Sequence, residues 1–309
     1  MPERLIIKSD FSRQDDWHEA FSSKDIQICL WDEAVDPDTV DYALVWQPEP
    51  GALARFSNLK LVFSIGAGVD HLMGPDMLPE NIPVVRMVEE SLTAGMVEYV
   101  VYQVLRFHRH MQQYDTLQRL KHWQTTIQVP AASRNVGILG FGTLGLACAQ
   151  ALSPFGFSMS GWSRTEKDLG EIKHYHGWEQ LDDFLDGCDI LICLLPLTAQ
   201  TRGILNRRTL TLLPKRSCLI NAGRGGHQVE EDILACLETG QLAAAALDVF
   251  ETEPLPSSSP LWNHPNVTIT PHIASMTTPQ FSADHVYDNI LRYRKGAPLT
   301  HVADMTRGY

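Results

Sequence analysis

Three short motifs in the last third of the chain carry side chains that could do chemistry together. Arg224 lies in the segment NAGRGG, Glu253 in LDVFETEP and His272 in TPHIA. Each motif is at or just beyond the end of a short apolar run of the kind that forms a strand. In an open α/β sheet, ligands bind outside the carboxyl ends of the strands, so we expect these three side chains to converge on one site.

This set of residue types fits the reduction of a 2-keto acid, which requires a hydride and a proton. Arg224 can hold the carboxylate and polarise the carbonyl oxygen. His272 can deliver the proton, because histidine side chains exchange protons near neutral pH, and Glu253 can hold the imidazole and favour its charged form. Singly, each residue is better explained by a salt bridge, a solvated acid or a hydrogen-bonded histidine. The hypothesis rests on the three together.

A glycine-rich turn precedes these motifs. The segment NVGILGFGTLG places Gly140, Gly142 and Gly145 directly after a candidate strand, with Thr143 and Leu144 at the start of a helix. The first glycine allows the tight turn, the second lets the backbone approach a pyrophosphate, and the third permits close packing of helix on strand. The N–H groups and dipole of the helix N-terminus favour an anion. The segment therefore predicts a dinucleotide site.

The end of the next strand indicates which dinucleotide is bound. NAD-preferring sites carry an acidic residue about 20 positions after the glycines, for the ribose 2′-OH. Here the positions hold Ser163, Arg164 and Thr165, with Lys167 close by, and Glu166 is past the strand end. An arginine and two hydroxyls can hold a 2′-phosphate, so we predict NADP over NAD, with NAD still possible. The alternative is a solvated polar turn.

Short apolar runs alternate with mixed segments in residues 1–92. The runs RLIIKS, DIQICLW, DYALVW and KLVFSI are typical of strands, and the segments between them suit helices, such as Asp15–Phe21 and Asp70–Leu78. Repeated βα units predict a parallel sheet with helices on its faces.

A long helix is expected next, over Ser91–Trp123, with an apolar face wide enough to join two domains or to face a partner subunit. After Pro130, six candidate strands alternate with helical stretches and predict a doubly wound sheet. One more helix is expected at about Phe281–Arg294. The six strands are NVGIL, FSMSGW, DILICLL, SCLIN, AAAALDV and VTIT.

Composition narrows the class of protein. The 309 residues carry a net charge of -12, which disfavours broad binding to nucleic acid or to an anionic membrane. The first residues lack the apolar core of a signal peptide, and no run approaches the roughly 18 apolar residues of a membrane span. The 6 cysteines form no CxxC pair. We expect a cytoplasmic protein with free, buried thiols.

Four further histidines were considered as metal ligands. His108 and His110 would point in nearly opposite directions from one helix, and His174 and His176 lack a nearby cysteine or paired carboxylate. We interpret them as polar surface residues and expect no metal.

The motifs together resemble those of the D-isomer-specific 2-hydroxyacid dehydrogenases. The matching segments are GILGFGTLG, LLPLTAQT, INAGRGGHQVEEDIL, AALDVFETEPL and TPHIAS. The likeness covers nearly the whole chain. Further segments are similar to bacterial members of the family that reduce glyoxylate and hydroxypyruvate: DYALVWQP, IGAGVDHL, GWSRT and SPLW.

The resemblance implies roles for individual residues. Arg224, Glu253 and His272 match the family's catalytic residues. Further matches are implied for the cofactor site: Leu195, Pro196, Ala222 and Asp248, the last as a contact of the nicotinamide carboxamide. The backbone N–H groups of Ala67, Gly68 and Val69 match a loop that binds the substrate carboxylate. Trp46 is expected near the substrate, although a packed strand-end tryptophan explains it almost as well.

The resemblance also implies the architecture: a Rossmann cofactor domain, residues 93–276, inserted into a flavodoxin-like substrate domain, residues 1–92 plus 277–309. Family members usually form homodimers through the long helix. The expected activity is NADPH-dependent reduction of glyoxylate to glycolate and of hydroxypyruvate to D-glycerate.

Two alternatives stay open from the sequence. One is a dehydrogenase of another D-2-hydroxy acid, such as D-lactate. The other is a nucleotide-sensing binding protein, because the family includes transcriptional corepressors with the same fold and the same three residues. The lack of long polar tails and the intact set of three favour an enzyme.

Overall fold

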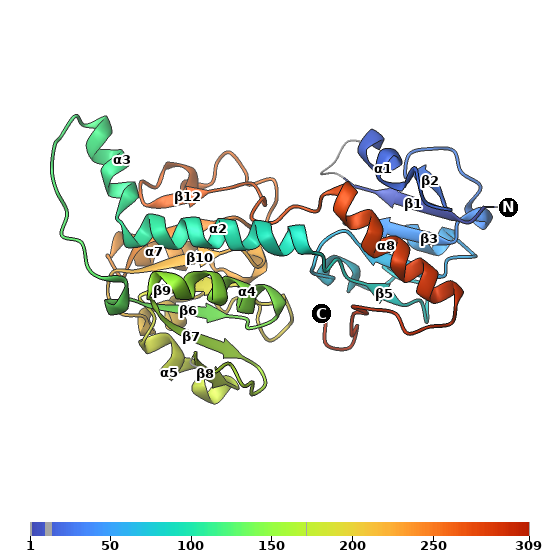
Figure 1. Cartoon of the computed structure of the whole chain (residues 1–309). Coiled ribbons are helices and arrows are strands. Elements are labelled where there is room, and N and C mark those ends of the chain that lie inside the picture. The colour runs from blue at the N-terminus through green and yellow to red at the C-terminus, as the bar shows by residue number, and fades with distance from the viewer. Residues whose placement is uncertain (1, 10–13, 171, 309) are drawn as a thin grey trace. The chain divides into compact units, whose positions relative to one another are not determined.

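The computed structural model describes residues 2–9, 14–170 and 172–308. The chain divides into two compact units. The smaller unit consists of Met1–Thr93 with Met276–Tyr309, and the larger unit of Ala94–Ser275. Both are α/β units built on parallel sheets (Figure 1). None of the helices in the described ranges is long and apolar enough to cross a membrane.

The smaller unit contains a five-stranded sheet in the order β2-β1-β3-β4-β5. All its strand pairs are parallel, and this order is that of the flavodoxin-like folds. The expected fold of this part is confirmed, with a short fifth strand that the sequence did not reveal. The strands are β1 (Arg4–Lys8), β2 (Gln27–Leu30), β3 (Tyr42–Val45), β4 (Leu61–Ser64) and β5 (Val84–Val85).

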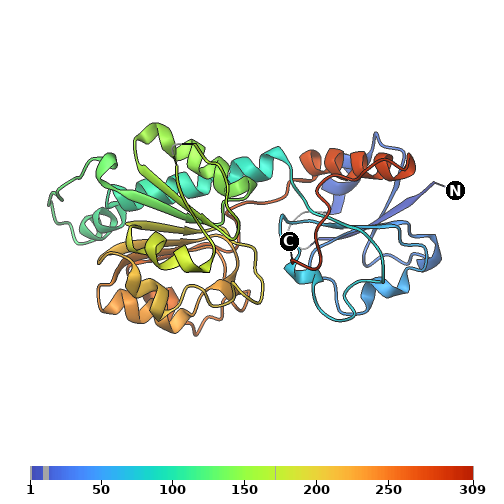
Figure 2. The same ribbon diagram turned by 90° about the horizontal axis from the view of Figure 1, so that it is seen from below.

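Two α-helices that lie far apart in the sequence pack against each other in the smaller unit: α1 (Gln14–Phe21) and α8 (Pro279–Arg294). Figure 2 shows α8 along one face of the sheet. Apolar side chains of short 3₁₀ turns, such as Leu53 and Leu72, pack onto the strands in a separate core cluster. The helix expected at Asp70–Leu78 was wrong. Only Asp70–Leu72 forms a 3₁₀ turn, because Gly74 and Pro75 interrupt the segment.

The larger unit contains a seven-stranded parallel sheet in the order β12-β11-β10-β9-β6-β7-β8. The order reverses at β6 and β9, as in a Rossmann fold, so the expected doubly wound sheet is confirmed. All six predicted strands are present. The sheet contains one more strand, β8, which the sequence pattern did not predict because KHYH contains no aliphatic residue. The strands are β6 (Asn135–Leu139), β7 (Ser158–Ser163), β8 (Lys173–His176), β9 (Ile190–Cys193), β10 (Ser217–Asn221), β11 (Leu242–Leu247) and β12 (Val267–Ile269).

Helices cover both faces of this sheet (Figure 2). On one face α2 and α4 pack in a core cluster with Ile138 and Ile220, and on the other α5, α6 and α7 pack in a second cluster with Leu191 and Leu219. All six cysteines are buried and free, as expected. The helices are α2 (Glu90–His108), α3 (Met111–Arg119), α4 (Thr143–Leu152), α5 (Leu181–Asp186), α6 (Arg207–Leu212) and α7 (Glu230–Glu238).

The single long helix expected over Ser91–Trp123 was wrong. The backbone breaks at His110, which has φ 57°, and α3 starts anew after it. α2 is held by buried side chains such as Val104 and Phe107, whereas α3 has no buried residue. The packing that favours a continuous helix therefore ends at His108. This histidine was expected on the surface, which was wrong: it is buried, with its ring centroid 5.0 Å from that of Phe157. In Figure 1, α3 and the segment after it stand away from the sheet of their unit.

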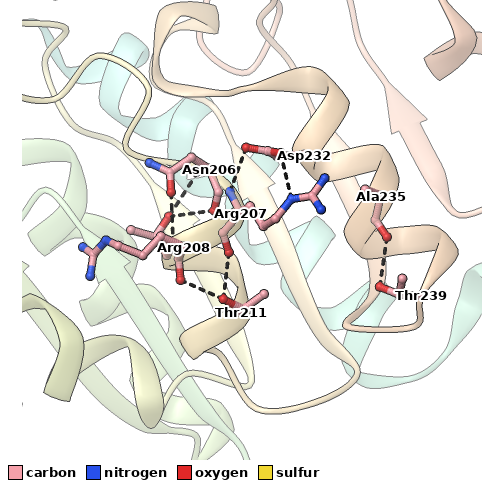
Figure 3. Close-up of polar contacts among 8 residues, drawn as sticks. Asn206, Arg207, Arg208, Thr211, Asp232, Ala235 and Thr239 are labelled. Carbon is pink, nitrogen blue, oxygen red and sulfur yellow. Dashed lines mark hydrogen bonds and ion pairs between the residues drawn. The ribbon is translucent and has the colours of Figure 1, made fainter.

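Polar contacts join α6 to α7 on the surface of the larger unit (Figure 3). The Asn206 side chain caps α6 by accepting from Thr209 N at 3.2 Å. Asp232 of α7 accepts from Arg207 N at 2.9 Å and from Arg207 Nε at 3.2 Å. These contacts satisfy N–H groups of the first turn of α6 and fix it beside α7.

Candidate active site

The residues expected to form a site in the larger unit gather at one edge of its sheet. They follow β6, β7, β9, β10, β11 and β12, and every pair among the neighbouring strands is parallel. Because parallel strands end at the same edge, the glycine turn, Arg224, Asp248 and His272 lie along one side of the sheet. The order reversal between β6 and β9 places the glycine turn at the point where open α/β sheets bind ligands.

The glycine turn after β6 fits a bound pyrophosphate. Gly140 has φ 102°, and a Cβ there would lie 2.7 Å from the Leu194 carbonyl oxygen. A Cβ on Gly145 would overlap the Gly140 carbonyl oxygen, so this position requires close packing of α4. A Cβ on Gly142 would meet nothing within 4 Å. The open space thus lies at the N-terminus of α4, where no side chain caps the helix.

The strand end of β7 is more ordered than a solvated turn. Ser163 is buried, and its hydroxyl donates to the Thr165 carbonyl oxygen at 2.8 Å. The same Oγ lies 2.8 Å from His174 Nε2 on β8. Arg164 and Thr165 are exposed, and Lys167 Nζ donates to the Phe141 carbonyl oxygen, inside the glycine turn, at 2.5 Å.

Sequence reasoning mentioned Lys167 without assigning it a role, and it interpreted His174 as a surface residue. His174 is instead half-buried and hydrogen-bonded to Ser163 at the end of β7. His174 lies on β8, which pairs with β7 in parallel. The pairing itself could not be read from the sequence, because β8 lacks an apolar pattern.

Glu253 and His272 form a hydrogen-bonded pair. His272 Nδ1 lies 2.8 Å from Glu253 Oε2, and Glu253 Oε1 accepts from Phe250 N at 2.9 Å. Burial raises the pKa of the Glu253 carboxyl, but the hydrogen bond and charge of His272, the Phe250 N–H and the charge of Arg224 outweigh it and lower the pKa below its ordinary value. The carboxylate is therefore ionised at neutral pH and orients the imidazole through Nδ1.

The loop that carries His272 is held by Asp248. Its carboxylate accepts from Ile273 N and from Ala274 N, both at 2.9 Å, and from Thr270 Oγ1 at 2.6 Å. His272 N donates to the Asp248 carbonyl oxygen at 2.8 Å, and His272 itself has φ 56°. A non-glycine residue at positive φ is held there by its surroundings, and these four bonds supply the restraint.

Tyr99 of helix α2 extends the hydrogen bonds around Asp248. The Tyr99 hydroxyl lies 2.9 Å from Thr270 Oγ1. Because Thr270 donates its hydroxyl hydrogen to Asp248, the Tyr99 hydroxyl must donate to Thr270. Sequence reasoning missed Tyr99 and Thr270 as supports of the His272 loop, since Tyr99 lies on an apolar helix far upstream.

Arg224 lies in the loop after β10. Its N–H donates to His227 Nδ1 at 3.1 Å, and its Nη1 donates to the Gly223 carbonyl oxygen at 2.8 Å. His227 is fully buried, and its Nε2 lies 3.2 Å from the Pro196 carbonyl oxygen. A neutral His227 thus ties the Arg224 loop to the loop after β9, where Leu195 and Pro196 were expected to line the cofactor site. Sequence reasoning did not single out His227.

The residues expected to bind substrate in the smaller unit lie at the carboxyl ends of β3 and β4. Trp46 is buried, and a Cβ on Gly66 would lie 2.8 Å from its ring. Its ring centroid lies 4.7 Å from that of His71. The packed tryptophan is therefore observed, and a contact with substrate stays a prediction.

The loop after β4 turns its carbonyl groups inward. Ser64 Oγ bonds the carbonyl oxygens of Gly66 and Gly68, at 3.0 and 2.8 Å. Within the described part of the chain, nothing accepts a hydrogen bond from the N–H groups of Ala67, Gly68 or Val69. These N–H groups can bind an anion.

Comparison with known proteins gives a consistent result. Residues 101–274 match the NAD-binding domain of the D-isomer-specific 2-hydroxyacid dehydrogenases. Glyoxylate/hydroxypyruvate reductase A of Serratia proteamaculans is 41% identical over 312 residues, which cover 99% of each chain.

Two solved structures are similar to this chain over nearly its whole length. A D-isomer-specific 2-hydroxyacid dehydrogenase of Xanthobacter autotrophicus, in complex with NADPH, is 40% identical with a TM-score of 0.94 and full coverage of both chains. An NADPH-dependent glyoxylate/hydroxypyruvate reductase of Sinorhizobium meliloti, in complex with NADP and sulfate, is 38% identical with a TM-score of 0.94, covering 99% of this chain and 100% of that one. The chain therefore belongs to the D-isomer-specific 2-hydroxyacid dehydrogenases, a family of oxidoreductases.

Proposed function

We propose that the protein reduces small 2-keto acids with NADPH, converting glyoxylate to glycolate and hydroxypyruvate to D-glycerate. The observation that carries the proposal is the Glu253–His272 pair at the same sheet edge as Arg224 and the glycine turn. The names and cofactors of the similar proteins support the choice of substrates and of NADPH.

In this proposal Arg224 binds the substrate carboxylate and polarises the carbonyl oxygen. Glu253 holds His272 through Nδ1, and His272 Nε2 then delivers the proton to the carbonyl oxygen as the alcohol forms. NADPH, when bound, supplies the hydride.

The larger unit is proposed as the cofactor domain. Gly140, Gly142, Thr143, Leu144 and Gly145 would hold the pyrophosphate at the start of α4. Leu195, Pro196 and Ala222 would line the rest of the cofactor site. Asp248 is proposed to contact the carboxamide, in addition to holding the His272 loop.

NADP is proposed over NAD because the end of β7 carries no acid. Arg164 and Thr165 are exposed there, and Ser163 and Lys167 fix the backbone around them. A guanidinium and a hydroxyl suit a 2′-phosphate.

The smaller unit is proposed as the substrate domain. The N–H groups of Ala67, Gly68 and Val69 would bind the substrate carboxylate, and Trp46 would shape the pocket behind the loop.

A homodimer is also proposed. Large apolar side chains are exposed on α2, on α3 and in the segment after α3, and such side chains usually mark a protein interface. They are Tyr102, Met111, Leu120, Trp123 and Ile127. Light scattering should give twice the 34.6 kDa chain mass, and Trp123→Ser with Ile127→Ser should lower it, whereas Phe281→Ser on α8 should not. A wild-type monomer would contradict this proposal.

We assign the protein to the cytoplasm. The support is the set of six free, buried cysteines, which suits a reducing compartment.

The experiment that tests the function is oxidation of NADPH and of NADH in parallel, each with glyoxylate, hydroxypyruvate and pyruvate. Turnover with NADPH and the first two acids is the expected result. Faster turnover with NADH would contradict the cofactor assignment but not the reaction. Preference for pyruvate would indicate another 2-hydroxy acid. Tight NADPH binding without any turnover would contradict the enzyme and favour a nucleotide sensor.

A further inference from the structure

Residues 163–167, at the end of β7, are held by hydrogen bonds to His174 of β8. His174 Nε2 lies 2.8 Å from Ser163 Oγ, and His174 Nδ1 accepts from Lys167 N at 3.4 Å. Arg164 and Thr165, the exposed residues proposed to bind the 2′-phosphate of the ribose, lie between these two partners in the sequence. Both ring nitrogens of His174 are therefore used on one short loop.

The hydrogen-bond directions fix the form of the imidazole. The Ser163 hydroxyl has one hydrogen and donates it to the Thr165 carbonyl oxygen at 2.8 Å. Its contact with His174 then requires that Nε2–H donates. Nδ1 must be without a hydrogen to accept from the Lys167 N–H, so the ring is neutral with its hydrogen on Nε2.

The surroundings of the ring agree with a neutral form. Burial lowers the pKa of His174, the charges of His176 and Lys167 lower it further, and Glu166 opposes them. A proton added at Nδ1 would face the Lys167 N–H, and one contact of the loop would be lost.

The same loop is also tied to the glycine turn. Lys167 Nζ donates to the Phe141 carbonyl oxygen at 2.5 Å. Phe141 lies between Gly140 and Gly142, so its carbonyl belongs to the turn proposed to hold the pyrophosphate. Ser163, His174 and Lys167 thus connect the loop proposed for the 2′-phosphate with the loop proposed for the pyrophosphate.

We propose that His174 is a positioning residue for selection of NADP over NAD. Its neutral imidazole holds residues 163–167 in the conformation that presents Arg164 and Thr165 to a 2′-phosphate. The inference rests on the proposed use of NADPH. The reason is preorganisation: a loop already ordered by His174 loses less conformational entropy when the phosphate binds. NADH has no 2′-phosphate, so its binding gains little from this order.

The first test measures binding without turnover. Calorimetry compares adenosine 2′,5′-bisphosphate with adenosine 5′-monophosphate, which differ only in the 2′-phosphate. His174→Ala should weaken the bisphosphate about 5-fold, the value of roughly one hydrogen bond, and leave the monophosphate within twofold. Lys173→Ala is the matched control on the same strand, because Lys173 is exposed and contacts Tyr175, and it should change neither.

The second test measures steady-state kinetics with both cofactors. His174→Ala should raise KM for NADPH by a similar factor, with kcat at saturating NADPH and KM for NADH unchanged. An equal loss for both probes or both cofactors would show a general structural role and overturn the inference. No loss for either would also overturn it.

Conservative variants keep the test valid if the alanine variant does not fold. His174→Gln can still donate to Ser163, and His174→Asn can still accept from Lys167. Each should lose less bisphosphate affinity than alanine, and full affinity in both variants would contradict a positioning role. If the wild type does not distinguish the two nucleotides, the NADP assignment fails. If the wild type binds the bisphosphate more tightly than the monophosphate and the variants keep the same ratio of affinities, the NADP assignment stands. Only the inference about His174 then fails.

Discussion

His272 Nδ1 lies 2.8 Å from Glu253 Oε2, and the other oxygen of Glu253 accepts from Phe250 N at 2.9 Å. One carboxylate therefore orients the imidazole while its own position is fixed by the backbone. In the proposed reaction Nε2 is the proton-transfer atom, so the rate should depend on both residues.

His272→Gln should abolish most turnover while NADPH still binds. The amide keeps polarity and much of the volume but cannot transfer a proton at neutral pH. We expect kcat to fall by at least about 100-fold, which is the usual contribution of a general acid. Steady-state rates together with NADPH titration would check this. A rate within threefold of wild type would contradict the proton-donor role.

Arg224→Lys should separate charge from geometry. The lysine keeps the positive charge but cannot make the paired bonds of a guanidinium with a carboxylate. KM for glyoxylate should rise about tenfold or more and kcat should fall, with Arg224→Ala worse in both. The matched control is Arg208→Lys, because the Arg208 guanidinium bonds Asp182 on the surface of the larger unit. Equal kinetics for Arg224→Lys and wild type would reject the proposed clamp.

The Glu253 carboxylate should stabilise the fold at neutral pH. Its pKa is lowered from the ordinary value of 4.5, so the stabilisation is fully present above about that pH and is lost as the pH falls through the lower folded-state pKa. Glu253→Gln should therefore melt below wild type at pH 7, and the gap should narrow in acid. Thermal unfolding across this range measures it. A difference in melting temperature that grows in acid would contradict the lowered pKa of Glu253.

Thr270→Val should act on catalysis through Asp248. The substitution keeps the shape and removes the donor that lies 2.6 Å from Asp248 Oδ1. The His272 loop should become less ordered, and kcat should fall about 3- to 10-fold, equivalent to roughly one hydrogen bond. Thr268→Val on β12 is the matched control. Tyr99→Phe, which removes only the outer bond, should lose less. Unchanged kcat in Thr270→Val would show that Asp248 needs no such support.

Gly142→Ala and Gly145→Ala should fail in different ways. A methyl group at Gly142 meets open space, so the fold should be kept and NADPH affinity should drop about tenfold, because the methyl group occupies the space that the pyrophosphate needs. A methyl group at Gly145 overlaps the Gly140 carbonyl oxygen, so the protein itself should be destabilised. Melting temperature and NADPH titration distinguish them. Tight NADPH binding in Gly142→Ala would place the pyrophosphate elsewhere.

The type of fold and the main chemical groups could be predicted from the amino-acid sequence. The alternation of apolar runs predicted most strands, because a strand buried on both faces needs consecutive apolar residues. The glycines of the turn after β6 and the motifs holding Arg224, Glu253 and His272 stand next to those runs, so parallel pairing alone was enough to bring them to one edge.

The contacts that hold these groups in place were visible only in the folded chain. Asp248 restrains the His272 loop, His227 ties Arg224 to the loop after β9, and His174 orders the end of β7. Each contact joins a side chain to a backbone group or hydroxyl of another segment, and hydrogen bonds of this kind leave no periodic pattern in a sequence. The same reason explains the break at His110, since a helix continues only as far as its packing partners do.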